Sequence, residues 1–159
     1  ELKKIQKDLN ATILYVTHDH VEATTMADRI GVLKDGVLSQ IGTPEEIYDN
    51  PNSIYVANRL GSPKINIFDL GKTKIPSKNK ATHAGIRPED ISITNKGHYD
   101  VYIETVELLG AETVISFKSD NINGMILTQT SDTFEEGKKI KIALNNKKML
   151  YFDNNGMRI

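Results

Sequence analysis

The first third of the chain alternates helix-like and strand-like patterns of apolar side chains. Residues 2–9 place leucine and isoleucine at helical spacing with lysines between them, which predicts the end of an amphipathic helix. Four consecutive apolar residues at 13–16 lie between polar neighbours, a pattern typical of a strand buried on both faces of a parallel sheet. Helical spacing returns over 20–27. We therefore expect a strand, a short loop and a helix, which together form an α/β unit.

Turn and capping residues mark the elements that follow. The Asp-Gly pair at 35–36, with apolar flanks, predicts a hairpin over 29–42 because glycine accepts a positive φ. The Thr-Pro-Glu-Glu run at 43–46 has the order of an N-cap, a first-turn proline and a capping-box glutamate. The helix that it begins should stop at Asn50-Pro51, and a second short helix should run from 53 to 60.

The pattern changes after residue 63 to a loop over 71–80 and then to strands alone. Alternating apolar and polar positions, separated by Gly and Asn turns, are typical of half-buried antiparallel strands. Many short strands in so few residues predict a small five-stranded barrel of the oligomer-binding (OB) type over 64–159. We expect the strands at 82–86, 91–94, 99–109, 113–118, 124–129, 139–144 and 148–152.

The composition is that of an ordinary folded protein. Hydrophobic residues make up 38% and charged residues 26% of the 159 positions, which argues against disorder. A net charge of −1 gives no overall attraction to nucleic acid or anionic lipid. The absence of cysteine excludes disulfides and thiolate metal sites and fits a reducing compartment. No apolar run approaches the ~20 residues of a membrane-spanning helix.

His18 is the strongest candidate for chemistry. It follows the apolar run at 13–16, at the strand end where open α/β sheets bind their ligands. A neutral imidazole at that place can donate a hydrogen bond to a phosphate oxygen. The alternative is a histidine that packs or caps near a helix start. Asp19 is better explained as a helix cap than as a catalytic acid, because its spacing from Glu22 is that of a capping box.

The other polar clusters favour structural explanations. The lysines of 72–80 have no aromatic residues among them for stacking on bases, so a solvated loop explains them better than nucleic-acid binding. The remaining histidines, at 20, 83 and 98, show no metal-ligand spacing, so we expect no metal site. No G-x-S-x-G nucleophile elbow is present. These residues do not support a self-contained enzyme.

The motifs in their order resemble those of the carbohydrate-importer branch of ABC ATPases, over almost the whole chain. The departures are His20, where glutamine is usual, and Ile65, where methionine is common. The matching segments are Val16–Asp19 with Glu22-Ala23 (the switch-histidine loop), Gly42–Pro44 with Glu46 and Tyr48, Asn50-Pro51, Gly61–Asn66, Gly85–Asp90, Leu109–Thr113 and Phe152–Gly156.

The resemblance implies an α+β protein in two parts. Residues 1–63 would be the C-terminal fragment of a P-loop α/β ATPase domain, and 64–159 an OB-like regulatory barrel. His18 would be the catalytic and ATP-contacting residue, touching the γ-phosphate and helping to hold the attacking water with a glutamate that lies upstream. The full-length subunit would use ATP and Mg²⁺ to import a sugar or related solute.

Partners and location follow from the same resemblance. A second copy of the subunit and the transmembrane permease subunits would be partners, with no nucleic acid, at the cytoplasmic face of the membrane. The chain opens in mid-pattern at Glu1 and has no G-x-x-x-x-G-K-[ST] phosphate loop. We therefore expect a truncated ATPase that alone is inactive and binds no cofactor.

Two alternatives remain open. The chain could be a stand-alone OB-fold binding or regulatory module for a small oxyanion or nucleic acid, with residues 1–63 as a structural appendage. It could also be a natural, degenerate regulatory protein that kept only this half. An L-S-G-G-Q-like stretch and an aspartate-glutamate pair upstream of Glu1 would identify the ATPase.

Overall fold

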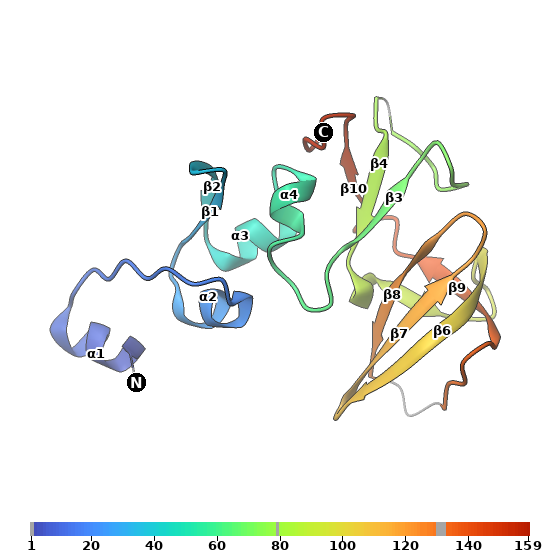
Figure 1. Cartoon of the computed structure of the whole chain (residues 1–159), viewed down its shortest axis with the longest axis horizontal. Coiled ribbons are helices and arrows are strands. Elements are labelled where there is room, and N and C mark those ends of the chain that lie inside the picture. Colours follow the sequence, from blue (N-terminus) through green and yellow to red (C-terminus); the bar gives the residue numbers. More distant parts are fainter. Residues whose placement is uncertain (1, 79, 130–132) are drawn as a thin grey trace. The chain divides into compact units, whose positions relative to one another are not determined.

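The computed structural model describes residues 2–78, 80–129 and 133–159, and it divides the chain into two compact units. These are Glu1–Pro51 and Asn52–Ile159, which run from blue to cyan and from green to red in Figure 1. The described part is mostly β, with three sheets and four short helices. None of its helices has the length and apolar character needed to cross a membrane.

The first unit consists of helices around a single hairpin. The hairpin turns at Asp35 and Gly36, whose φ angles of 51° and 79° are both positive, as the sequence predicts. Thr43 and Glu46 form the complete capping box, with the Thr43 N–H donating to Glu46 Oε2 and the Glu46 N–H to Thr43 Oγ1. Its elements are α1 (Leu2–Leu9), α2 (His20–Met26), β1 (Ile30–Lys34), β2 (Val37–Gly42) and α3 (Pro44–Asp49).

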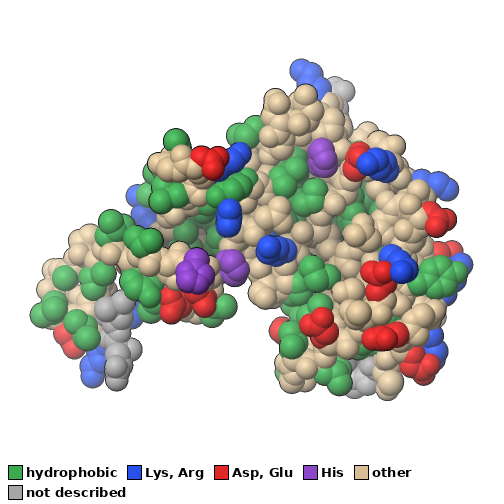
Figure 2. Space-filling view, in the orientation of Figure 1, with side chains coloured by type: hydrophobic (Ala, Val, Ile, Leu, Met, Phe, Trp, Pro, Cys, Tyr) green, Lys and Arg blue, Asp and Glu red, His purple; other side chains and the backbone are tan. Residues whose placement is uncertain are grey.

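The expected buried strand at 13–16 is wrong for this chain. Residues 11–17 form neither helix nor strand, and Leu14 and Val16 are 92% and 84% exposed. A strand needs neighbours to pair its N–H and C=O groups, and no described segment pairs with this one. Hydrophobic side chains consequently lie at the surface of the first unit (Figure 2). Over its described residues 2–51, the unit has one sheet, the antiparallel β1–β2 hairpin.

The second unit contains two antiparallel sheets and confirms the strand-rich pattern. One sheet has the order β10-β4-β3 and the other the order β5-β9-β6-β7-β8. Each of the expected strands appears, with ends that differ from the expected ones by at most two residues. The elements are α4 (Ile54–Ala57), β3 (Asn66–Asp69), β4 (His83–Ile86), a 3₁₀ turn (Pro88–Asp90), β5 (Ile91–Ile93), β6 (Tyr99–Leu109), β7 (Glu112–Lys118), β8 (Asn123–Thr128), β9 (Lys139–Leu144) and β10 (Leu150–Phe152).

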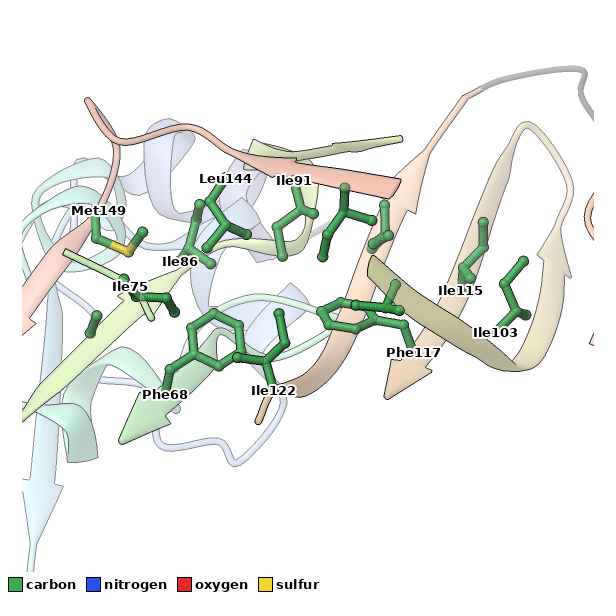
Figure 3. Close-up of a cluster of buried hydrophobic side chains, with 14 of the residues drawn as sticks. Phe68, Ile75, Ile86, Ile91, Ile103, Ile115, Phe117, Ile122, Leu144 and Met149 are labelled. Carbon is green, nitrogen blue, oxygen red and sulfur yellow. The ribbon is translucent and has the colours of Figure 1, made fainter. Parts of the chain in front are cut away.

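Both sheets of the second unit enclose one hydrophobic core (Figure 3). Phe68 and Ile86 enter it from the three-stranded sheet, and Ile115 and Phe117 enter it from the five-stranded sheet. The described ladders do not join the two edge strands β5 and β8. The result is an OB-like arrangement, in which the sheets curl around a shared core.

Asn66 links the two sheets where no backbone ladder does. Its side-chain Nδ2 donates to the Met125 carbonyl at 2.9 Å, and its Oδ1 accepts from the Met125 N–H at 2.7 Å. The side-chain amide thus makes the two hydrogen bonds that the backbone of a neighbouring strand would make. Asn66 itself is only 5% exposed. A Cβ on Gly124 would lie 2.4 Å from Asn66 Oδ1, so this approach requires glycine at 124.

Arg87 holds the short helix α4 onto the β-rich unit. It is 5% exposed, and its Nη1 donates to the carbonyls of Ala57 at 3.1 Å and Leu60 at 2.7 Å. Ala57 also packs in a cluster with Ile65, Leu150 and Phe152. The sequence predicts the domain boundary at residue 63, whereas the compact units divide after Pro51.

The anchoring of α4 makes the starting point of the β-rich unit testable. We expect a 52–159 fragment to be more stable than a 64–159 fragment by about 2 kcal/mol, because only the longer one keeps the carbonyls that bind the Arg87 guanidinium. Urea unfolding followed by circular dichroism measures the difference. Arg87→Met should lower the stability of the longer fragment far more than that of the shorter one. Equal unfolding midpoints for the two fragments would contradict the expectation.

The Asn66 bridge predicts a coupled pair of substitutions. Asn66→Ala should destabilise the chain by about 1–3 kcal/mol, because it removes the partners of two half-buried backbone groups of Met125. Gly124→Ala should cost about 1–3 kcal/mol through overpacking. In the double variant the cost of Gly124→Ala should be smaller by at least about 1 kcal/mol, because Asn66→Ala has removed the amide that the new Cβ would meet. Urea unfolding of the four proteins tests this, and strictly additive costs would argue against it.

Candidate functional site

His18 lies at the surface, in the bend between the extended residues 11–17 and α2. No hydrogen bond to another described residue holds its imidazole. Figure 2 shows histidine and acidic side chains together on the surface of the first unit. The side chain is therefore free to meet a partner that comes from elsewhere.

Glu22 ties together the segments before and after His18. Its Oε2 accepts from the Tyr15 hydroxyl at 3.0 Å and from the Thr17 hydroxyl at 2.9 Å. The Thr17 hydroxyl also accepts from the N–H of Asp19 at 3.0 Å. These contacts connect the residues before His18 to the first turn of α2, which follows it.

Asp19 is the N-cap of α2, which confirms half of the expected capping box. Its Oδ1 accepts from the N–H groups of Val21 at 2.7 Å and Glu22 at 3.0 Å. The reciprocal bond, from the Asp19 N–H to Glu22, is not made, because the Thr17 hydroxyl takes that N–H and the Glu22 carboxylate serves Tyr15 and Thr17. The sequence spacing alone did not distinguish these partners.

The hydrogen bonds determine the charge around His18. The backbone N–H of Glu22, more than any other group, lowers the pKa of Asp19, so this carboxyl stays ionised. The hydrogen bond to Glu22 is the main cause that raises the pKa of Tyr15, so its hydroxyl stays protonated as a donor. The loop thus presents an imidazole beside carboxylates that are already satisfied. It offers one contact to a phosphate, not a complete phosphate site.

His20 lies two residues after His18, as the first residue of α2, and the other two histidines belong to the second unit. His83 lies in β4 with its Nδ1 2.9 Å from the Thr82 hydroxyl, and His98 precedes β6. Among the described residues, no group of three potential metal ligands comes together.

A separate hollow of about 450 Å³ lies in the second unit, between the edge strands β5 and β8 of the five-stranded sheet. Apolar residues such as Ile91 and Phe134 line it, together with the carboxylates Glu89 and Glu112. The sequence does not predict this hollow, because its walls come from segments far apart in the chain.

Comparison with known families identifies the class of the second unit. Residues 84–152 match the TOBE domain family. This range begins in β4 and ends with β10, so it spans both sheets and includes Arg87. The chain therefore contains a TOBE domain.

The chain as a whole is similar to the C-terminal portion of ATP-binding subunits of ABC-type sugar importers. It is 41% identical over 134 residues to the sn-glycerol-3-phosphate import ATP-binding protein UgpC of Psychromonas ingrahamii, which covers 75% of this chain and 36% of that protein. It is 32% identical over 184 aligned positions to the trehalose/maltose import ATP-binding protein MalK of Thermococcus litoralis, covering 96% and 50%. The chain thus spans half or less of the length of these relatives.

The Glu22 contacts predict a measurable change at Tyr15. Glu22→Gln removes the negative charge that the Tyr15 hydroxyl faces, so the pKa of Tyr15 should fall toward the ordinary value of about 10. An NMR pH titration of ¹³C-labelled tyrosine ring carbons follows this group. Glu45→Gln, in the first turn of α3, makes the same charge change and should leave Tyr15 unaltered. An identical Tyr15 titration in Glu22→Gln and the parent chain would refute the assignment.

Proposed function

We propose that this chain is the C-terminal part of the ATP-hydrolysing subunit of an ABC importer for a sugar or related solute. The observation that carries the proposal is the extent of the similarity. Relatives with import ATP-binding names align over 75% and 96% of the chain, whereas the TOBE match is confined to 84–152. The similarity therefore continues into the residues that precede the TOBE domain.

His18 is the proposed catalytic and ATP-contacting residue of this part. The alignment that covers 96% of the chain leaves only a few residues out, so its span includes position 18. In the proposal, the imidazole donates one hydrogen bond to the γ-phosphate and helps to orient the attacking water. Tyr15, Thr17 and Glu22 support the loop through the contacts described above.

The remaining contacts to ATP and Mg²⁺ belong, in the proposal, to other segments of the full-length subunit. The His18 loop supplies one donor, and its carboxylates are already engaged with hydroxyl and N–H groups. Polyphosphate binding needs several N–H groups and a cation. The residues present therefore fit a contributor to a nucleotide site, and we do not expect this chain alone to hydrolyse ATP.

The exposed run at 13–16 is consistent with such a role. In the proposal, residues 1–63 belong to a P-loop α/β ATPase domain, and this run is a strand of its parallel sheet with helices on both faces. Exposure of Leu14 and Val16 is then the expected state of a central strand without its neighbours. Residues 64–159 are the regulatory part.

The partners and the location follow from the same proposal. The subunit would form a dimer with a second copy and drive the transmembrane permease subunits from the cytoplasmic face of the membrane, as a peripheral protein. Nucleic acid is not among the proposed partners, because the lysines of 72–80 have no aromatic residues among them to stack on bases.

The proposed role of His18 is tested in the full-length subunit. His18→Ala should lower ATP turnover by about 10²-fold or more, the typical effect of losing a positioned catalytic group. Affinity for ATP should change little, because one hydrogen bond among many contributes about 0.5–1.5 kcal/mol, or up to about 3 kcal/mol to a charged group. Steady-state ATPase assays and nucleotide titrations measure the two effects separately.

The neighbouring histidine provides a matched control for that experiment. His20→Gln changes the histidine two positions further on, the first residue of α2, to the residue that is usual in the resembling family, so turnover should stay near that of the parent. A His18→Ala subunit with near-parental turnover would remove the catalytic assignment. Equal losses of ATP turnover in both variants would mean that turnover depends on the conformation of this segment and not on the His18 imidazole.

A further inference from the structure

A second hollow in the β-rich unit has no role in the proposed function. Its volume is about 220 Å³, and three segments form it: the loop after β3, the start of β6 and the turn between β7 and β8. Its polar lining residues are Lys74, His98, Asp100, Ser119 and Asn121.

Buried neighbours fix the walls of this hollow. Ile75 follows Lys74 and Ile122 follows Asn121, and both isoleucines are buried in the core of the unit (Figure 3). Tyr99, beside His98, packs against the same core. The loops that carry the polar side chains are therefore attached at three points, which limits the entropy lost when a ligand orders them.

The turn between β7 and β8 is held by its own hydrogen bonds. The Ser119 hydroxyl accepts from the N–H groups of Asn121 at 3.4 Å and Ile122 at 3.2 Å, and the Ser119 N–H donates to the Ile122 carbonyl at 2.7 Å. The side-chain amide of Asn121 has no hydrogen-bond partner among the described residues. It is available as a donor at the rim of the hollow.

One lysine, Lys74, lines the hollow. Asp100 is its one lining carboxylate, and Lys139 and Lys141 lie 3.3 and 3.4 Å from it. The hydrogen bond from Lys139 is the largest of the causes that lower the pKa of Asp100, so its charge is present and is offset by two lysines. Lys74 has no carboxylate partner in the described part of the chain. Asp120 belongs to the same turn but does not line the hollow.

We propose that Lys74, His98 and Asn121 bind a small anion that carries a phosphate group. An ammonium, an imidazole and a carboxamide can each donate to phosphate oxygens, and the three come from segments that the core holds in place. The donors are exposed, and salt screens exposed charges, so we expect a dissociation constant of about 1 mM, which corresponds to about −4 kcal/mol. The ligand could be free phosphate or the phosphate ester of a small polyol, for which Asp100 would accept a hydroxyl.

Amide NMR titration of the ¹⁵N-labelled 159-residue chain tests the proposal. Inorganic phosphate, sn-glycerol 3-phosphate and glycerol are the three probes, each raised to about 20 mM at constant ionic strength so that screening does not change. Phosphate should shift the amides of 74, 98–100 and 119–122, and glycerol should not. Tighter binding of the ester supports a polyol phosphate as ligand, and equal binding supports free phosphate.

Two variants with the same charge change distinguish phosphate binding in the hollow from non-specific attraction to surface lysines. Lys74→Gln should weaken phosphate binding about tenfold. Lys72→Gln removes the same charge from the same loop, at a lysine that pairs with Asp69 and does not line the hollow, and should weaken binding less than twofold. The proposal fails if neither phosphate compound shifts these amides, if glycerol shifts them equally, or if both variants weaken binding to the same extent.

Discussion

The second unit depends on a pair of hydrogen bonds that a side chain makes in place of a backbone. No backbone ladder joins the two sheets among the described residues, yet the Asn66 amide gives the backbone of Met125 both an acceptor and a donor. Because Met125 lies in β8 and Asn66 in β3, this bridge holds an edge of each sheet at the distance that the common core requires. The same contact explains why residue 124 is glycine.

Arg87 extends that unit toward the N-terminus. Its guanidinium binds carbonyls at 57 and 60, so the short helix α4 belongs to the TOBE-containing unit. A residue of the TOBE domain therefore binds the segment that precedes this domain. A buried guanidinium suits this contact because it offers several donors in a fixed plane.

The first unit contrasts with the second in how its apolar residues are used. Its turns and caps form as local chemistry dictates, but the run at 13–16 stays exposed. Short-range hydrogen bonds are enough for a hairpin and for capped helices, whereas a central strand requires partners on both sides. Among the described residues, the side chains of Glu22 and Asp19 hold the loop that carries His18. Local hydrogen bonds can therefore shape this loop in a unit with few buried side chains.

The sequence by itself determined the features that depend on near neighbours: the 35–36 turn, the 43–46 cap, the β6 and β9 strands, and His18 as the candidate residue between a strand-like run and a helix. Only the tertiary structure decided the features whose partners lie far away in the chain. These are the absence of a strand at 13–16, the short strand β3, the Glu22 contacts across His18, the Asn66 and Arg87 links, and the hollow around Lys74. The reason is physical: periodicity and capping act over a few residues, but burial and pairing depend on which distant segment supplies the other half of each contact.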